Sequence, residues 1–448
     1  MSTSPLMTVS GIRGIVDESL TADFIARVAF VQTRLAGAQT VVVGRDTRPS
    51  GAALSRAVFR GIRAAGAEPV DLGIAPTPTT CVATAHLGAG AGVIITASHN
   101  PLPYNGYKMV HGSGRLYNDT ECRAVYDRLD SVSAQDLERI GKADDNPSRT
   151  FNAAPVHIER ILGAVDVDLV RAASISVAID ATNGAAAAVF PRLLDALGVQ
   201  WLGVHVALDG NFVHNPEPRP EHLTDLAALL RETPDVWGGF AFDPDADRLA
   251  PMAENGDGIS EEMTLALALE NLLARGSRTV VTNLSTSMVI DDVARAHGAT
   301  VTRTAIGEAN VVAGMLSAGD AVGGEGNGGV IFPAVSTVRD GLTGLALIVE
   351  SMARSRQTLS RLAARWTQYP LLKRKIALGD EPPAAVIERL AARFASENID
   401  TQDGLKIIRE HGWVHIRPSN TEPILRCYAE AKTQDEAEAL AAMIAEEV

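Results

Sequence analysis

The sequence predicts an α/β protein with three similar mixed-sheet α/β domains and a smaller C-terminal α+β domain. One pattern recurs three times: a β-branched strand, a polar turn, a helical stretch rich in Ala, Leu and Arg, a glycine and a second strand. Its copies start near Thr40, Ile175 and Thr279, and such long spacings favour related α/β domains over a solenoid. Near residue 370 the pattern changes to strand, loop, strand and a helical tail, which predicts a different last domain.

The predicted domain boundaries follow from length and from polar breaks. With 448 residues the chain is too long for a single core. The clearest break is the stretch 144–155, which is rich in Asp, Asn and Pro. We predict domains at 1–150 with a serine loop, 151–254 with a metal loop, 255–367 with a sugar-binding loop and 368–448 with a phosphate-binding loop.

Composition excludes several classes of protein. The net charge of −14 argues against a nucleic-acid partner, because a phosphate polymer needs a basic face. Three scattered cysteines, Cys81, Cys122 and Cys427, indicate neither a disulfide framework nor a zinc cluster, and are consistent with a reducing cytoplasm. The start of the chain does not resemble a signal peptide, and no apolar run is long enough to span a membrane. We therefore expect a cytoplasmic protein with no membrane partner.

The first chemical signal is the stretch 94–101, where an apolar run stops at Ser98-His99-Asn100-Pro101. Asn and Pro favour turns, and the residue before a proline avoids the helix, so a buried strand delivers Ser98 onto a loop. We expect this hydroxyl nucleophile to be presented rather than buried. By itself the Ser-His pair is equally compatible with a structural turn.

The second signal is an acidic loop with Asp243, Asp245 and Asp247 at alternating positions after an apolar run. Three close carboxylates repel one another unless a divalent cation neutralises them, and oxygen ligands favour Mg²⁺ or Ca²⁺. Mg²⁺ facing a phosphate is the preferred interpretation, with Arg248 as an added cation. An EF-hand, which needs glycine where Arg248 stands, and a solvated acidic loop are the alternatives.

Two further loops offer polar groups suited to a sugar phosphate. Arg417, Ser419, Asn420 and Thr421 supply a guanidinium, hydroxyls and an amide, which match a phosphate dianion; a plain strand-linking turn is the alternative. The glycine-rich stretch 323–329 lacks the dinucleotide spacing, but its Glu325 and Asn327 are suited to sugar hydroxyls unless it is only a flexible turn. Arg13 and Lys108 are lone cations near glycines, for which a surface role is the default.

Together these motifs resemble the α-D-phosphohexomutase family over essentially the whole chain. The serine and aspartate motifs are the most specific of the six. The matching segments are Ser-Gly-Ile-Arg-Gly at 10–14, Gly-Arg-Asp-Thr-Arg at 44–48, Thr-Ala-Ser-His-Asn-Pro at 96–101, Asp-Pro-Asp-Ala-Asp-Arg at 243–248, Gly-Glu-Gly-Asn-Gly-Gly at 324–329 and Arg-Pro-Ser-Asn-Thr-Glu-Pro at 417–423. The resemblance implies that the four domains surround a central cleft.

The resemblance also implies the chemistry. It implies that phosphorylated Ser98 gives its phosphoryl group to a hexose monophosphate and that the resulting hexose 1,6-bisphosphate, which is also the activator, turns over within the cleft. The other phosphate of the bisphosphate then returns to Ser98. One Mg²⁺ is held by Ser98, Asp243, Asp245 and Asp247. Lys108, Arg13 or His99 handles the hydroxyl proton, Arg248 offsets charge, and the loop of Arg417 grips the phosphate that is not reacting. The expected partner is a small sugar phosphate, and the expected assembly is a monomer or homodimer.

Departures from the commoner bacterial pattern concern the sugar. Asn327 stands where serine is usual, Gly329 where histidine is frequent, and Glu308 where several relatives carry histidine or a basic residue, which is similar to the archaeal-type branch. A carboxylate prefers a cation, so Glu308 with Glu325 favours the ammonium of glucosamine 6-phosphate and predicts a phosphoglucosamine mutase. Phosphomannomutase or phosphoglucomutase activity, a metal-dependent sugar phosphatase and a binding protein without catalysis are the alternatives.

Overall fold

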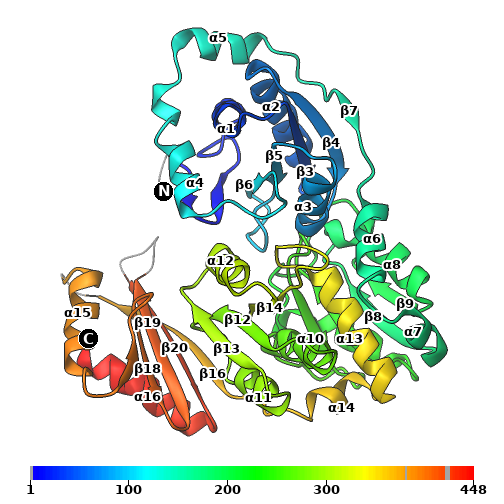
Figure 1. Cartoon of the computed structure of the whole chain (residues 1–448), viewed down its shortest axis with the longest axis vertical. Helices are drawn as coiled ribbons and strands as arrows, with labels where there is room; N and C mark the ends of the chain where they lie inside the picture. Colours follow the sequence, from blue (N-terminus) through cyan, green and yellow to red (C-terminus); the bar gives the residue numbers. More distant parts are fainter. Residues whose placement is uncertain (1–3, 379–380, 419–423) are drawn as a thin grey trace.

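The computed structural model describes residues 4–378, 381–418 and 424–448 in four units. In Figure 1 the first unit lies at the top, the second at the right, the third in the lower middle and the fourth at the lower left. The chain therefore runs around the molecule. The central region of Figure 1, near β14 and α3, is where segments of the first three units approach one another.

The first unit is a seven-stranded mixed sheet with helices on both faces. Side chains alternate across its strands, so Val41 and Val43 pack with α1 and α2 while Val42 packs on the α3 side. The strand order is β1-β2-β6-β5-β3-β4-β7. The elements are β1 Leu6–Thr8, β2 Gly11–Ile15, α1 Ala22–Ala36, β3 Thr40–Arg45, α2 Gly51–Ala64, β4 Glu68–Ile74, α3 Thr77–His86, β5 Ala91–Ile95, β6 Tyr104–His111, α4 Asp119–Tyr126, η1 Leu129–Ser131, α5 Ala134–Lys142 and β7 Arg149–Thr150.

The second unit has a four-stranded sheet in the order β11-β10-β8-β9, in which β8 runs parallel to β9 and β10. The parallel strands β8 and β10 end side by side, because Asp180 pairs with Ala241. The elements are α6 Ala154–Leu162, α7 Val167–Ala173, β8 Ser176–Asp180, η2 Ala185–Ala188, α8 Phe190–Leu197, β9 Gln200–Val204, η3 Pro220–His222, α9 Thr224–Glu232, β10 Gly239–Phe242 and β11 Leu249–Met252.

The third unit has a four-stranded sheet in the order β13-β12-β14-β15 and shares a hydrophobic core with the second. Its helices α10 and α13 are buried on almost every side, which fits their mostly apolar sequences. The elements are α10 Glu262–Ala274, β12 Thr279–Asn283, α11 Val289–Ala296, β13 Thr300–Thr304, α12 Glu308–Ala318, β14 Ala321–Glu325, β15 Gly329–Ile331, α13 Gly341–Ser355 and α14 Leu359–Ala363.

The fourth unit is a smaller antiparallel sheet with its own core, packed against two helices. Its strand order is β16-β20-β19-β18-β17, and Thr433 begins the last helix with a capping box. The elements are β16 Leu371–Ala377, α15 Pro383–Arg393, β17 Asn398–Asp400, β18 Leu405–Arg409, β19 Gly412–Pro418, β20 Ile424–Ala431 and α16 Gln434–Glu447. The predicted fold class, three mixed-sheet α/β units and a smaller α+β unit, is confirmed.

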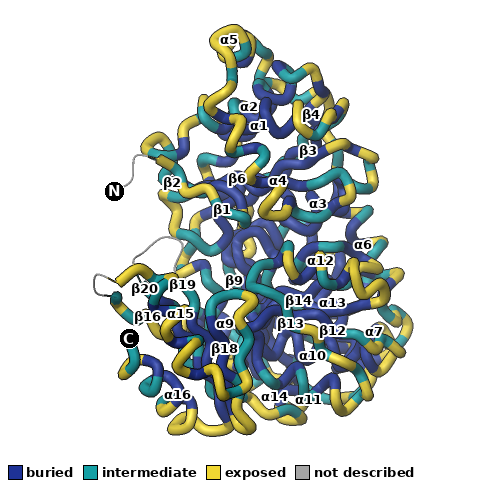
Figure 2. Tube along the Cα trace, turned by 60° about the vertical axis from the view of Figure 1, so that its left-hand side comes forward, coloured by how far each residue is buried: buried dark blue, intermediate teal, exposed yellow. Residues whose placement is uncertain are grey.

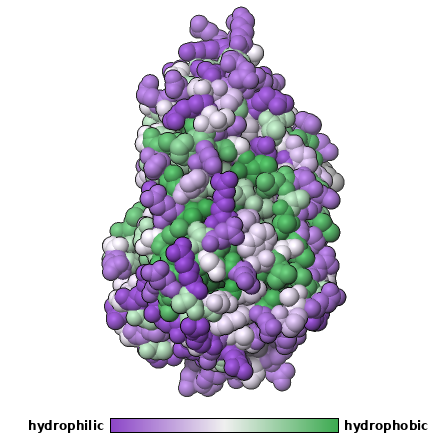
Figure 3. All heavy atoms as spheres, turned by 90° about the vertical axis from the view of Figure 1, so that its right-hand side faces the viewer, coloured by the Kyte–Doolittle hydropathy of each residue, from purple (hydrophilic) through white to green (hydrophobic). Residues whose placement is uncertain are grey.

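Burial and the distribution of polar side chains over the surface agree with this architecture. Figure 2 shows buried segments running through the middle of the molecule and exposed ones at the periphery, as around α5. In Figure 3 hydrophilic side chains cover both ends of the face, and hydrophobic patches lie between them. Cys81, Cys122 and Cys427 are all buried and free. Within residues 4–378, 381–418 and 424–448, no helix is long and apolar enough to cross a membrane.

Candidate active site

Ser98 lies on the loop that follows β5, in a backbone conformation that few non-glycine residues adopt. Its φ is 50°, in the left-handed region. Arg48 fixes this turn, since its Nη2 donates hydrogen bonds of 2.6 Å to the carbonyl oxygens of both Ser98 and Asn100. The hydroxyl of Thr96 accepts a 2.9 Å hydrogen bond from the Ser98 amide. A strained and strongly tethered turn of this kind is common at functional sites.

The expectation that Ser98 is presented to solvent is wrong. The residue follows a buried strand, as predicted, but it is only 1% exposed. The turn residues Asn and Pro bring it onto a loop, yet the second unit covers that loop. Ser98 Oγ donates a 2.8 Å hydrogen bond to Oδ2 of Asp243, which lies 145 positions further along the chain, in the second unit.

His99 faces the same hydroxyl. Its Nδ1 lies 3.3 Å from Ser98 Oγ. Burial, together with the positive charges of Arg248 and Arg13, lowers the pKa of His99 to about 2. The ring is therefore neutral in this arrangement, and one of its nitrogens is an acceptor.

The three aspartates occupy the connection between β10 and β11. Ala246 takes a left-handed φ of 56°, which folds the loop tightly enough for the three carboxylates to converge. All three residues are fully buried. Strands flank this loop where an EF-hand needs helices, and the carboxylates are not solvated, so both alternatives to a buried ion site are wrong.

Lys108, on β6, bridges two of these aspartates from the first unit. Its Nζ lies 2.6 Å from Asp245 Oδ2 and 2.9 Å from Asp247 Oδ2. Asp245 Oδ2 also accepts a 2.6 Å hydrogen bond from the hydroxyl of Thr77, at the start of α3. Burial opposes the ammonium charge, but Asp245 and Asp247 outweigh it and raise the pKa of Lys108. The default surface role for Lys108 is wrong.

The donor chemistry of the aspartate cluster fits a hard divalent cation. Ligand oxygens of Asp243, Asp245 and Asp247 lie within 4.8 Å of one another. Asp245 Oδ1 and Asp247 Oδ1 are buried and lack a hydrogen-bond partner among the described residues. Burial, with repulsion from the other two carboxylates, raises the pKa of Asp243. A cation among these oxygens would give the unpaired oxygens a partner and would offset the repulsion between the carboxylates. A donor set made only of oxygens suits Mg²⁺.

Arg339 is the main residue of the cluster that sequence reasoning missed. Its guanidinium joins the aspartate loop to the third unit through Asp247 Oδ2 at 2.7 Å, Glu325 Oε2 at 2.8 Å and Glu308 Oε2 at 3.1 Å. The positive charges of Arg339, Lys108 and Arg248 outweigh burial and lower the pKa of Asp247. An Arg-Asp-Gly sequence at the start of α13 was a signal, because Asp340 caps that helix and leaves Arg339 at its entrance.

Two of the predicted sugar-binding residues, Glu308 and Glu325, lie beside Arg339. Glu325 ends β14 and also accepts a 2.8 Å hydrogen bond from Asn283 Nδ2. Glu308 begins α12, and its Oε1 accepts a 2.8 Å hydrogen bond from the Arg339 amide. Asn327 Oδ1 is buried without a partner among the described residues. Both carboxylates are thus already paired with a guanidinium, which the sequence did not predict.

Arg13 and Arg248 lie beside the serine and aspartate loops, whereas Arg417 lies in the fourth unit. Arg13 Nη1 donates a 2.9 Å hydrogen bond to Asn100 Oδ1 beside the serine turn, and Arg248 Nε lies 3.7 Å from Asp247 Oδ1. Arg417, at the end of β19 in the fourth unit, pairs with Asp403 at 3.3 Å, and its Nε has no partner among the described residues. Ser419, Asn420 and Thr421 fall outside the described residues.

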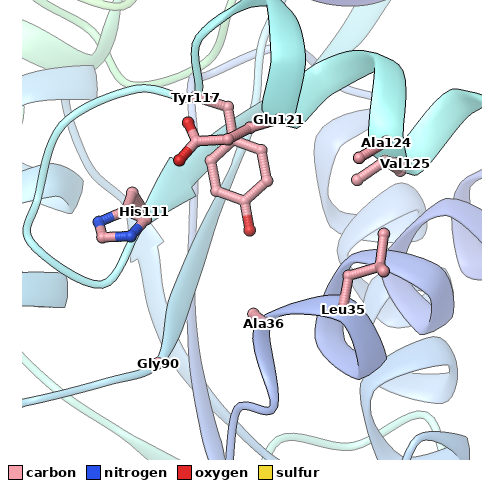
Figure 4. Close-up of a pocket in the computed structure, with 8 residues that line it drawn as sticks. All are labelled: Leu35, Ala36, Gly90, His111, Tyr117, Glu121, Ala124 and Val125. Atoms are coloured by element: carbon pink, nitrogen blue, oxygen red, sulfur yellow. The ribbon is translucent and has the colours of Figure 1, made fainter.

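The hollow drawn in Figure 4 is not part of this cluster. It lies between the end of α1 and α4 and has a volume of about 360 Å³. Its polar side chains have local partners: Glu121 pairs with Arg115 at 2.7 Å, and His111 Nδ1 lies 2.9 Å from Ser113 Oγ. Nothing in this hollow leaves a buried polar group for a ligand.

Known proteins match the chain along its whole length. The phosphoglucomutase/phosphomannomutase family matches as α/β/α domain I at 5–136, domain II at 155–256, domain III at 260–369 and the C-terminal domain at 371–447. A phosphoglucomutase/phosphomannomutase of Thermococcus kodakarensis is 37% identical, with 95% of this chain and 94% of that protein covered. A probable phosphoglucosamine mutase of Methanopyrus kandleri is 36% identical, with coverages of 96% and 95%.

Solved structures agree with this match. A phosphoglucomutase/phosphomannomutase family protein from Burkholderia thailandensis has a TM-score of 0.83 at 29% identity and covers 98% of this chain and 95% of its own. A putative phosphomannomutase from Thermus thermophilus has a TM-score of 0.82 at 26% identity, and both chains are covered completely. The chain belongs to the phosphoglucomutase/phosphomannomutase family. It is an enzyme of the isomerase class, a phosphohexomutase that transfers phosphate within a sugar.

Proposed function

We propose that the enzyme interconverts hexose 6-phosphate and hexose 1-phosphate through a phosphorylated Ser98. The observation that carries this proposal is the 2.8 Å hydrogen bond between Ser98 Oγ and Asp243, beside a buried cluster of cations and carboxylates. Such preorganised charge stabilises a transferring phosphoryl group. Ser98, Asp243, Asp245 and Asp247 would hold one Mg²⁺, which supplies charge neutralisation for the phosphoryl oxygens when bound.

In each transfer the bond between phosphorus and one oxygen breaks as the bond to another oxygen forms. When phosphoserine reacts, the sugar hydroxyl oxygen gains the phosphoryl group and Ser98 Oγ leaves. The hydroxyl proton passes to the neutral ring of His99 and then to Ser98 Oγ, which lies 3.3 Å from Nδ1. An arriving phosphate offsets Arg248 and Arg13, the two cations that help to lower the pKa of His99, and so makes the ring a better base.

The second transfer reverses the first on the other end of the sugar. The hexose 1,6-bisphosphate turns over within the site, and its second phosphoryl group returns to Ser98. Lys108 remains an ammonium beside Asp245 and Asp247 and adds positive charge near the reacting oxygens. The loop that contains Arg417, Ser419, Asn420 and Thr421 would bind the phosphate that is not reacting.

For the sugar we propose glucosamine phosphate. Glu308 and Glu325 are two buried carboxylates that share the guanidinium of Arg339, while Lys108 also offsets the charge of Asp247. Burial raises the pKa of Glu308, and an ammonium beside it would favour its ionised form. The name of the Methanopyrus kandleri relative agrees with this choice. Glucose or mannose phosphate is the second candidate, because Arg339 already pairs with both glutamates and the Thermococcus kodakarensis relative is named for those sugars.

The test is to compare kcat/KM for glucosamine, glucose and mannose 1-phosphates with Mg²⁺ and a hexose bisphosphate, in the wild type and in Glu308→Gln. We expect glucosamine phosphate to rank first and to lose its advantage in Glu308→Gln. An unchanged ranking in the variant would contradict the role of Glu308. Steady release of inorganic phosphate without isomerisation would instead identify a phosphatase.

A further inference from the structure

A second cluster of metal-ligand side chains lies in the second unit, outside the serine and aspartate loops. Asp180 ends β8, His205 directly follows β9, and His214 lies on the loop that comes next. One ligand atom from each residue falls within 4.8 Å of the others. These three residues form no local sequence motif, because 34 positions separate Asp180 from His214.

In each ring, the nitrogen that does not face Asp180 already has a hydrogen-bond partner. His214 Nδ1 lies 2.8 Å from the backbone oxygen of Asn215, and a carbonyl oxygen only accepts, so Nδ1 carries the hydrogen. His205 Nε2 lies 3.1 Å from the Asp225 carboxylate, which also only accepts when ionised. Carboxylate and carbonyl partners of this kind are typical of histidines that bind a metal through the other nitrogen.

The two ring nitrogens that face Asp180 would repel its carboxylate if both rings were neutral. A neutral imidazole ring carries one hydrogen, which here is on His205 Nε2 and on His214 Nδ1. The other nitrogens, His205 Nδ1 and His214 Nε2, therefore carry lone pairs. Both face the same ionised oxygen, Asp180 Oδ2, at 3.1 Å. Lone pairs facing a carboxylate repel, so the site needs positive charge: either a second proton on each ring or one cation shared by all three atoms.

The two separations that involve Asp180 Oδ2 are close to those around a tetrahedral ion. Zinc bonds of about 2.0–2.2 Å to nitrogen and oxygen give ligand atoms roughly 3.3–3.5 Å apart, close to the two separations of 3.1 Å. The Asp180 carboxylate is held in position, because its other oxygen, Oδ1, accepts a 2.8 Å hydrogen bond from the Thr182 amide. The histidine side chains are 12% and 13% exposed, so an ion can enter from solvent.

We propose that Asp180, His205 and His214 form a zinc site that fixes the loop 205–215 against the serine turn. Two imidazoles and one carboxylate favour a zinc-class transition ion over Mg²⁺. Phe212 lies between the two histidines in sequence, and the Arg48 guanidinium stacks over its ring at 5.0 Å. The same guanidinium holds the carbonyl oxygens of Ser98 and Asn100. The zinc site therefore supports the loop whose Phe212 packs against Arg48, and Arg48 in turn fixes the serine turn.

The test measures zinc bound to the full-length protein by elemental analysis after dialysis with excess Mg²⁺, which competes for the all-oxygen aspartate cluster. We expect close to one equivalent of zinc in the wild type and a large loss in His205→Asn and in His214→Asn. His222→Asn is the matched control, because the ring of His222 lies 2.8 Å from the Glu217 backbone oxygen, outside the cluster of Asp180, His205 and His214, and this variant should retain zinc. Asp245→Asn should also retain it.

Two readouts keep the test independent of activity and of folding defects in the variants. Cobalt added to the metal-free wild type should give visible absorption bands of a tetrahedral ion, and zinc should displace them. Zinc should raise the Tm of the wild type and of His222→Asn but not of His214→Asn. The proposal is overturned if the wild type retains no zinc against Mg²⁺, which is the result expected if second protons occupy the rings, or if all variants bind zinc equally.

Discussion

The junction of the first unit with the second and third differs in chemistry from the junction between the third and fourth. In the former, Lys108, Asp245, Asp247 and Arg339 bring opposite charges from three units into direct buried contact. In the latter, Glu430, Asp403 and Lys406 hydrogen-bond to backbone groups of the third unit. The ion pair between Lys373 and Glu261 that crosses this junction is partly exposed. The first junction is thus a buried ionic site built from three units, and the second joins two units through hydrogen bonds to backbone groups and a partly exposed ion pair.

Electrostatics sharpen this difference. Lys406 in the fourth unit donates to the Leu284 backbone oxygen and stacks over Trp413 at 4.1 Å, and it forms no ion pair with a carboxylate in the described part of the chain. Burial lowers the pKa of Lys406 to about 6, whereas the aspartates raise that of Lys108. A hollow of about 530 Å³ also lies between the third and fourth units, lined in part by Arg303 and Tyr369. Charged side chains such as Asp291, Arg295 and Lys432 also line this hollow, so the first junction is distinguished by its buried ion pairs between units and not by charge alone.

The largest expected effect comes from removing the nucleophile at the first junction. Ser98→Ala should lower kcat by about 10³-fold or more, because no other hydroxyl replaces the phosphoryl carrier. Circular dichroism should show an unchanged fold, and equilibrium binding of hexose phosphate should persist. Ser113→Ala, on an exposed turn of the same unit, is the control with normal activity. Substantial mutase turnover by Ser98→Ala would remove the phosphoserine mechanism.

The next effect tests the charge network itself. Arg339→Met leaves Asp247, Glu308 and Glu325 without their shared cation, and breaking a buried pair costs about 3–5 kcal/mol. Denaturant unfolding should therefore show a large loss of stability. Arg295→Met is the control from the third unit: its pair with Asp292 is largely exposed on the arginine side, and the change should be below about 1 kcal/mol. Equal losses in both variants would erase the contrast between a buried ionic junction and a surface pair.

A smaller effect is expected from the fourth unit. Arg417→Ala should raise KM roughly tenfold and change kcat less, because a charge-assisted hydrogen bond to phosphate contributes about 1.5–3 kcal/mol. Arg409→Ala, which removes an exposed Arg–Glu397 pair from a strand of the same sheet, should leave both constants unchanged. Initial-rate kinetics separate the two parameters. A change in kcat alone would place Arg417 with the reacting groups rather than with the distant phosphate.

The smallest effect is a pH dependence at the second junction. Burial raises the pKa of Glu262 from 4.5 to about 8. The unfolded chain then loses its proton first, so stability falls as pH rises from about 4.5 to about 8. Glu262→Gln lacks this loss, and its Tm relative to the wild type should increase by up to roughly 5 °C across that window.

Glu261→Gln is the neighbouring control for this pH effect. Burial opposes its charge, but Lys373 outweighs burial and lowers the pKa of Glu261. This carboxyl therefore contributes stability above its ordinary pKa that is lost as the pH falls through the folded value. The Tm difference of Glu261→Gln should accordingly change in the opposite direction with pH. Parallel pH profiles for the two variants would contradict the assignment of the Glu262 proton.

The sequence by itself determined the fold class and the two most informative loops. Hydrophobic periodicity and turn residues are local properties, so they identify β5 before Ser98 and β10 before Asp243 without tertiary contacts. The alternation of Asp243, Asp245 and Asp247 likewise indicates converging carboxylates, and the structure brings them together.

Only the tertiary structure decided what surrounds those loops. Arg339 reaches Asp247 across 92 positions and Arg48 reaches Ser98 across 50, distances at which no sequence period carries information. The burial of Ser98 and the pairing of Glu308 with Arg339 depend on how whole units pack. The reason is physical: local periodicity specifies which face of an element is apolar, whereas the charges that meet at a junction are set by docking elements distant in sequence.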